Sequence, residues 1–138
     1  MIRPGERIFV DTGAWIALAV VPDGMHERAR DIWSQLLAAG ARPLVSMPVL
    51  LETFTYLQRK ISADLAARWW QSLDAVQFLE RIECTNAELR AAMPYLARRE
   101  LHKLSLVDAT SFVLMKKHKL RVAFTFDTHF VTAGFRLA

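Results

Sequence analysis

Cysteine is almost absent from this chain of 138 residues, because Cys84 is its only copy. One cysteine forms no intrachain disulfide and no cysteine-based zinc cluster, and both exclusions fit a reducing compartment. No apolar run reaches the roughly 18 residues that a membrane-spanning helix needs. The apolar stretch 14–21 is short and lacks the basic flank and cleavage pattern of a signal peptide. We therefore expect a cytoplasmic protein that makes no membrane contact.

Motifs built from glycine or from paired histidines are also missing. The five glycines form neither a phosphate-binding loop nor the Gly-x-Ser-x-Gly turn of a serine hydrolase. The four histidines show no paired spacing typical of metal ligands. His129 follows Asp127 by two residues, and we interpret it as a surface residue.

Basic residues outnumber acidic residues. Lys and Arg total 18 against 14 Asp and Glu, which gives a formal net charge of +4 and a pI near 9.6. This excess favours a polyanionic partner such as RNA. Apolar residues make up 53% of the chain, and a folded chain of this size buries roughly 68% of its unfolded surface. A single hydrophobic core is therefore large enough to support the fold.

Short apolar runs alternate with helical patterns along the whole chain. We expect strands at 6–10, 43–46, 78–83, 121–126 and 135–137, and helices at 14–20, 26–39, 48–60, 63–73, 85–96, 105–117 and 128–132. Thr85 and Glu88 form a capping-box pattern, and Pro94 should kink or restart its helix. The alternation predicts one α/β domain over residues 1–138, with a central, mainly parallel sheet of four to five short strands flanked by helices.

Four acidic residues stand beside apolar, core-like segments at separate places in the chain: Asp11, Glu52, Asp108 and Asp127. Carboxylates are rarely buried unless they are paired or bind a metal. Ligand sites of open α/β sheets form at the carboxyl ends of strands, which is where Asp11 and Asp127 fall. The four acids therefore suggest one shared cation site.

Each acid also has a structural alternative. Asp11 and Asp127 could cap the helices that follow them, although Thr12 could serve in place of Asp11. Asp108 could complete a capping box with the serine three residues before it. Glu52 could be an exposed helix residue, although its neighbours leave only a narrow polar face. The hypothesis of a site therefore depends on the joint pattern of the four acids.

This joint pattern resembles that of the PIN-domain ribonucleases, and within them the VapC-type toxins of bacterial toxin–antitoxin pairs. The resemblance is carried by the segments Phe9-Val10-Asp11-Thr12, Leu51-Glu52, Leu104-Ser105-Leu106-Val107-Asp108-Ala109 and Thr125-Phe126-Asp127-Thr128-His129-Phe130. It covers essentially the whole chain, and its most specific part is the late pair of acids, spaced by 19 residues. The resemblance implies that Asp11, Glu52, Asp108 and Asp127 form an acidic metal pocket, and that Thr12 and Thr125 line it.

The expected cofactor is Mg²⁺ or Mn²⁺. Clustered carboxylates raise one another's pKa unless a cation joins them, and these two cations prefer oxygen ligands. Water activated by the metal or by an acid such as Asp108 would attack the phosphorus in line. We therefore predict a metal-dependent endoribonuclease that leaves 5′-phosphate and 3′-hydroxyl ends without a cyclic intermediate.

Substrate and partner contacts are predicted less directly. Arg98, Arg99 and Lys103 precede Asp108 closely and are the candidates for RNA contact. The basic run 116–121 lies a helix length further on, so we interpret it as a solvated helix end. The adjacent residues Trp69 and Trp70 cannot both face the core, which makes one of them a candidate dimer contact. The resemblance further implies a homodimer and a cognate antitoxin protein.

Two other functions are compatible with parts of the pattern. A Mg²⁺-dependent phosphohydrolase with an aspartyl nucleophile would need Asp-x-Asp after the first strand, but Gly13 stands at the second position. A non-catalytic RNA-binding or assembly module with a relic acidic pocket would not need all four acids. Both alternatives are therefore less favoured than the nuclease.

Overall fold

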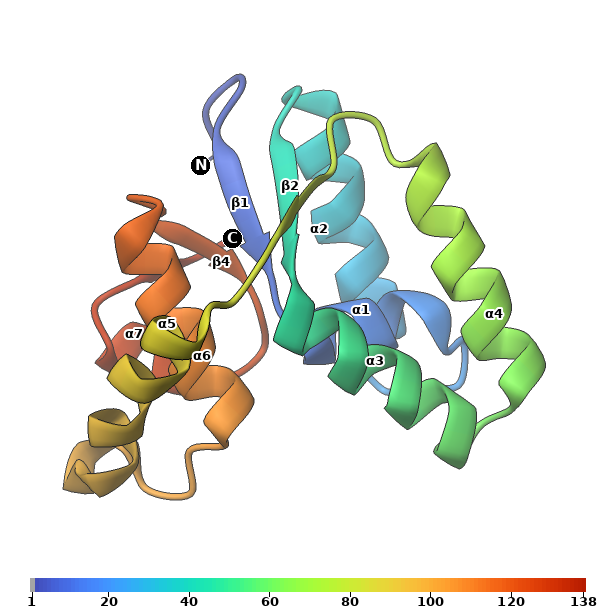
Figure 1. Ribbon diagram of the computed structural model, residues 1–138. Coiled ribbons are helices and arrows are strands. Elements are labelled where there is room, and N and C mark those ends of the chain that lie inside the picture. Colours follow the sequence, from blue (N-terminus) through green and yellow to red (C-terminus); the bar gives the residue numbers. More distant parts are fainter. Residues whose placement is uncertain (1) are drawn as a thin grey trace.

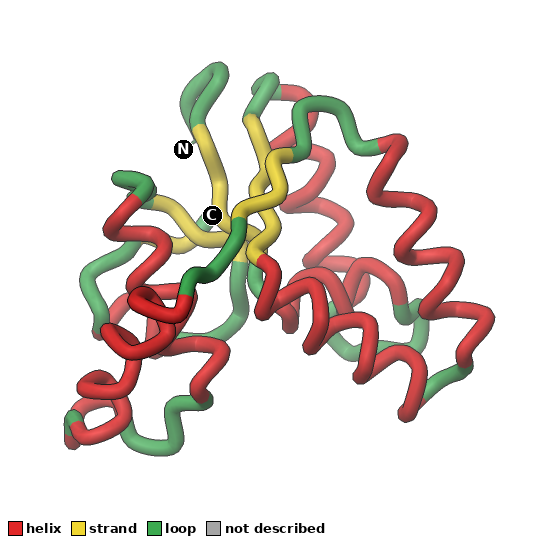
Figure 2. The backbone as a smooth tube through the Cα atoms, in the orientation of Figure 1, coloured by secondary structure: helices red, strands yellow, loops and turns green. Residues whose placement is uncertain are grey.

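Five short parallel strands form the centre of the protein, whose computed structural model describes residues 2–138 (Figures 1 and 2). The strands are β1 (Arg7–Val10), β2 (Arg42–Ser46), β3 (Glu80–Ile82), β4 (Val122–Phe124) and β5 (Arg136–Leu137). Their order across the sheet is β3-β2-β1-β4-β5, and every pairing is parallel. The predicted sheet of four to five short, mainly parallel strands is confirmed.

Helices cover both faces of this sheet. They are α1 (Thr12–Ala19), α2 (His26–Ala38), α3 (Met47–Lys60), α4 (Ala63–Ser72), α5 (Asn86–Ala92), α6 (Leu106–Lys117) and α7 (His129–Thr132), with short 3₁₀ turns at Leu73–Ala75, Met93–Ala97 and Arg99–Leu101. The chain steps outward from β1 to β2 and β3, then returns to add β4 and β5 on the other side of β1. Because parallel crossovers are right-handed, this reversal sends α1–α4 and α5–α7 to opposite faces, as Figure 1 shows.

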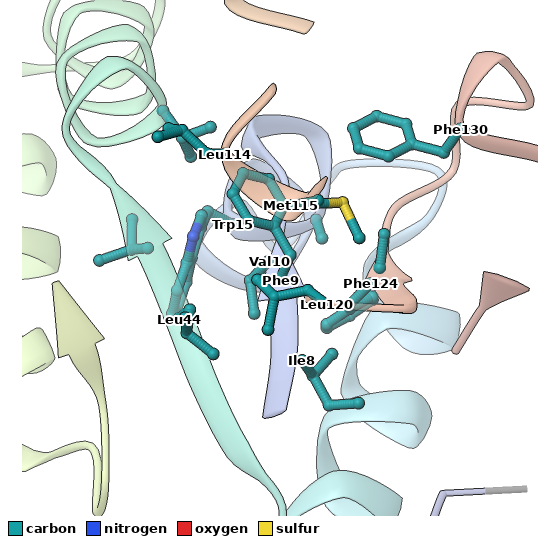
Figure 3. Close-up of a cluster of buried hydrophobic side chains, with 14 of the residues drawn as sticks. Ile8, Phe9, Val10, Trp15, Leu44, Leu114, Met115, Leu120, Phe124 and Phe130 are labelled. Carbon is teal, nitrogen blue, oxygen red and sulfur yellow. The ribbon is translucent and has the colours of Figure 1, made fainter. Parts of the chain in front are cut away.

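The core is densest around β1, the central strand. Residues 8–10 are fully buried, as expected for a strand covered by helices on both faces. Leu44 from β2, Phe124 from β4 and Met115 from α6 surround them (Figure 3). Burial of each such side chain contributes roughly 1.5–3 kcal/mol. The backbone that leads into Asp11 is therefore held firmly in place.

Most expected elements are confirmed, with differences at their ends. The third strand is confined to Glu80–Ile82, because Phe78 is exposed and adopts a φ of +62° that a regular strand does not allow. The first helix begins at Thr12 rather than Ala14. The kink or restart expected at Pro94 is confirmed, since α5 gives way there to a 3₁₀ turn.

Serine and threonine hydroxyls cap the N-termini of several helices. Ser46, Ser62 and Ser105 each accept a backbone N–H of the helix that follows, and the predicted capping box of Thr85 and Glu88 is complete. Ser105 matters most for function, because its cap fixes the first turn of α6, which carries Asp108. Within residues 2–138 no helix is long and apolar enough to cross a membrane.

Candidate active site

The candidate site lies where the sheet reverses its strand order. β1 and β4 are neighbours, and the backbone N–H of Asp11 donates to the carbonyl oxygen of Phe124 at 3.0 Å. The chain leaves these two strands toward opposite faces, so side chains at their carboxyl ends face a crevice between diverging helices. Asp11 and Asp127 both follow these strand ends, as the sequence predicts.

Asp11 is a buried carboxylate whose two oxygens have different surroundings. The residue is 5% exposed, and Oδ2 accepts a hydrogen bond of 2.9 Å from the Thr125 hydroxyl. Oδ1 is buried with no hydrogen-bond partner. Burial, and next the negative charge of Asp108, raise the pKa of Asp11 from 3.8 to about 7, against the opposing effect of the Thr125 hydrogen bond. The ionised form of Asp11 is therefore incompletely compensated.

Thr125 holds two of the acids at once. While its hydroxyl donates to Asp11, the same oxygen accepts the backbone N–H of Asp127 at 3.0 Å. Thr125 is 4% exposed, so little of it is available to a ligand. Thr125, which was predicted from the sequence to line the pocket, thus fixes the positions of Asp11 and Asp127 relative to each other.

Asp108 sits in the first turn of α6. Its backbone N–H donates to the Ser105 hydroxyl at 3.0 Å, so the expected cap at Ser105 is present. Burial raises the pKa of Asp108 from 3.8 to about 6; hydrogen bonding to Ser105 opposes this rise, and the charges of Asp127 and Glu52 add to it. The helix-start role and the clustering with other acids therefore coexist at Asp108.

Asp127 is half-exposed and lies in the loop between β4 and α7. Its Oδ1 accepts the backbone N–H of His129 at 2.9 Å, so Asp127 also shapes the start of α7. The His129 ring lies against the same carboxylate, with Nδ1 2.8 Å from Oδ1. The ring N–H is out of line for a hydrogen bond, so this contact is an ion pair when the ring is protonated.

Glu52 reaches the group from α3, on the other side of the site. It is half-buried, and its negative charge acts on Asp108. It also borders a largely apolar groove of about 830 Å³ between α3 and α5. Of the four acids, only Glu52 lines that groove. All four acids are therefore electrostatically linked, with Glu52 at the margin.

The donor chemistry of these acids suits a hard divalent cation. Every donor is a carboxylate oxygen, and the unpartnered, buried Oδ1 of Asp11 is a ligand atom without a hydrogen bond to lose. The spacing is more open than a bound ion requires, because within residues 2–138 no three His, Cys, Asp or Glu side chains are grouped closely enough to hold one. Rotation of the half-exposed Glu52 and Asp127 side chains would have to complete such a site.

The other predicted contact residues are Thr12 and three basic residues that precede α6. Thr12, the first residue of α1, is buried, and its hydroxyl has no hydrogen-bond partner. Arg98, Arg99 and Lys103 are exposed in the segment before α6, and the Arg98 guanidinium lies 4.6 Å from the centre of the Tyr95 ring. All three basic side chains are therefore accessible to a polyanion.

Sequence reasoning missed the part played by His129. Its side chain is 25% exposed, and Nε2 donates to the carbonyl oxygen of His102 at 2.7 Å. The interpretation of His129 as a surface residue does not account for this contact. The close spacing from Asp127 was the only signal in the sequence, and it does not reveal a contact with a segment 27 residues away.

A parallel α/β sheet with carboxylates gathered at its switch point is an arrangement that suits domains acting on phosphate esters through divalent cations. The sequence model of the family described as "PIN domain" matches residues 8–136. The chain therefore belongs to the PIN-domain family, which confirms the resemblance found from its motifs.

Individual relatives agree with this assignment. The "23S rRNA-specific endonuclease VapC20" of Mycobacterium tuberculosis is 36% identical over 131 residues, covering 93% of this chain and 95% of the relative. The crystal structure of M. tuberculosis VapC20, described as a sarcin–ricin loop cleaving toxin, matches with a TM-score of 0.81 at 31% identity, over 93% and 95% of the two chains. VapBC2 from Rickettsia felis matches with a TM-score of 0.68 at 13% identity, over 96% and 97%, and supports the fold alone.

Proposed function

We propose that this chain is the endoribonuclease toxin of a toxin–antitoxin pair and hydrolyses RNA with the help of Mg²⁺ or Mn²⁺. The observation that carries the proposal is the electrostatic linkage of Asp11, Glu52, Asp108 and Asp127 at the switch point of a PIN domain. The raised pKa values of two of these acids are what carboxylates show when they are built to share a cation.

The roles of the acids follow from their surroundings. Asp11, buried and fixed by Thr125, is the least mobile cation ligand, while Asp127 and Glu52 supply ligands from half-exposed positions. A bound divalent cation supplies positive charge that acidifies water and stabilises the developing charge on phosphate. Asp108, held in the first turn of α6 beside the other acids, is the candidate to accept a proton from the attacking water.

RNA binding is assigned to the basic residues that precede Asp108 in the chain. Arg98, Arg99 and Lys103 would contact phosphates, with Thr12 at the floor of the site. On the strength of the M. tuberculosis relative, we propose ribosomal RNA of the large subunit as the substrate class. The predicted products carry 5′-phosphate and 3′-hydroxyl ends.

The proposed partners are an antitoxin protein and a second copy of the chain, and the proposed compartment is the cytoplasm. Trp69 is buried, whereas Trp70 is 45% exposed and packs edge-on against Phe54. Together with the exposed Leu51, Trp70 gives the α3–α4 hairpin an apolar outer surface suited to a protein contact. We treat residues 1–138 as one nuclease domain.

The test is cleavage of defined RNAs by the purified protein. A 23S rRNA fragment that contains the sarcin–ricin loop and an unrelated hairpin of equal length are incubated with protein in EDTA, Mg²⁺ or Mn²⁺. We expect cleavage of the first RNA only with metal, 5′-phosphate ends, and no cleavage by Asp11→Asn. Binding without cleavage in every metal would favour the RNA-binding module, and 2′,3′-cyclic phosphate ends would exclude water as the nucleophile.

A further inference from the structure

His129 connects two segments that carry different parts of the site. Its Nε2 donates to the carbonyl oxygen of His102 at 2.7 Å, and its Nδ1 lies 2.8 Å from the carboxylate of Asp127. The first partner belongs to the segment 98–105, which leads from α5 into the cap of α6. One ring therefore spans the gap between the loop of Asp127 and the segment before Asp108.

The segment 98–105 needs an anchor at its tip. Leu101 is buried and holds the middle of the segment, but His102 and Lys103 are exposed, and Lys103 adopts a φ of +62° that costs a residue with a side chain. The hydrogen bond from His129 lies directly before this turn. It gives the His102 carbonyl oxygen a hydrogen-bond partner and fixes the peptide group between His102 and the strained Lys103.

The anchored segment carries the basic side chains assigned to RNA. Arg98, Arg99 and Lys103 lie on either side of the His102 carbonyl that His129 binds. On the other side of the ring, Oδ1 of Asp127 accepts the His129 backbone N–H at 2.9 Å and lies 2.8 Å from Nδ1 of the ring. Loss of the ring would release both groups together.

We propose that His129 is a positioning residue of the proposed reaction: it links the Asp127 carboxylate to the backbone of the basic segment 98–105. The inference rests on the proposed function for the identity of the cation and of the RNA. Groups that orient a ligating carboxylate from behind typically affect metal affinity by 10–100-fold when they are removed. His129 should therefore act on metal affinity and on the order of segment 98–105, with no contact to substrate.

Three substitutions separate the two contacts. His129→Ala removes both of them. His129→Gln keeps an amide N–H at about the place of Nε2 and can still reach the His102 carbonyl, whereas the shorter His129→Asn can reach only Asp127. His26→Ala is the matched control, because His26 Nδ1 also bonds a backbone carbonyl, that of Ala17, at 2.7 Å, but His26 is the first residue of α2 and lies outside the segments that carry the site.

The test combines Mn²⁺ titration calorimetry with hydrogen exchange of the metal-free protein. We expect His129→Ala to bind Mn²⁺ about 10-fold more weakly and to exchange the amides of Leu101 and Leu104 faster than wild type. His129→Gln should restore the slow exchange, His129→Asn should not, and His26→Ala should match wild type in both assays. Unchanged Mn²⁺ affinity in His129→Ala, or equal exchange in the Gln and Asn variants, would overturn the proposal. Absence of Mn²⁺ binding in wild type would instead refute the proposed function.

If His129→Ala does not fold, the Gln and Asn variants still decide the question. They differ by one methylene group and keep a polar side chain of similar character. If segment 98–105 exchanges slowly in the Gln variant but not in the Asn variant, the link to His102 is supported. Slow exchange in both variants contradicts the link.

Discussion

Substitution of Asp11 by Asn should make the metal-free protein gain stability relative to wild type as the pH rises. The native pKa of Asp11 is raised from 3.8 to about 7 because the carboxylate is buried and faces other acids. A group with a raised native pKa binds more protons in the folded state than in the unfolded state between these two values. Stability is therefore highest at low pH and is lost as the pH rises toward 7.

The size of the effect follows from the shift. A rise of about 3 pKa units corresponds to roughly 4 kcal/mol of destabilisation once Asp11 is fully ionised in the folded state. Between pH 5 and pH 8 this cost grows by roughly 2–3 kcal/mol, because at pH 5 native Asp11 is still mostly protonated. Asn carries no titrating proton, so it escapes the pH-dependent part of the cost.

Asn has a cost of its own, which is constant with pH. Its amide can replace the oxygen that accepts the Thr125 hydrogen bond, but the other amide atom inherits the position of Oδ1, which has no partner. An unsatisfied buried polar group costs about 1–3 kcal/mol. The difference between the two pH values is therefore more informative than the change at either pH alone.

The assay is urea unfolding in EDTA at pH 5 and pH 8 for wild type, Asp11→Asn and the control Asp31→Asn. Asp31 is exposed on α2. We expect the stability of Asp11→Asn relative to wild type to improve by roughly 2–3 kcal/mol from pH 5 to pH 8, with no such change for Asp31→Asn. An equal effect of Asp11→Asn at both pH values would refute the assigned burial and clustering of this carboxylate.

Three further predictions address the remaining parts of the site. Thr125→Val should weaken Mn²⁺ binding about 10-fold or more, because it removes the hydrogen bonds to both Asp11 and the Asp127 N–H; Thr128→Val, on an exposed neighbour, is the calorimetric control. Arg98→Ala and Lys103→Ala should each make the negative slope of log K against log salt for single-stranded RNA shallower by about 0.7. Arg121→Ala, in the loop between α6 and β4, should leave the slope unchanged in the same filter-binding titration. Trp70→Glu should shift the protein from dimer to monomer in analytical ultracentrifugation, because it places a charge on the exposed apolar surface of the α3–α4 hairpin; a wild type that is already monomeric would contradict this.

The fold was readable from the sequence because its signals are local. Buried runs such as residues 8–10 and caps such as Ser105 mark where elements begin and end, and alternation of strands with helices specifies a parallel sheet. Element ends were less predictable, since the exposed Phe78 and the early start of α1 at Thr12 depend on tertiary packing.

The site was readable in part. The switch point brings Asp11 beside the end of β4. This placement follows from the parallel sheet topology, which the alternation of strands and helices in the sequence predicts. The buried hydrogen bond from Thr125 to Asp11 joins residues 114 positions apart, and the bond from His129 to the His102 carbonyl involves a backbone atom. Neither hydrogen bond produces a periodic pattern in a single sequence. The contacts that hold the acids in place could therefore be identified only from the structure.

The central claim is that Asp11, Glu52, Asp108 and Asp127 form one divalent-cation site. The most direct test is to measure Mn²⁺ binding by electron paramagnetic resonance. The proteins are wild type, Asp11→Asn, Glu52→Gln, Asp108→Asn, Asp127→Asn and the control Asp31→Asn. The account predicts saturable Mn²⁺ binding by wild type and Asp31→Asn, and weaker binding by each of the four site variants. The affinity should fall least in Glu52→Gln, because Glu52 lies at the margin of the site. Wild-type affinity in Asp11→Asn or Asp108→Asn would contradict it.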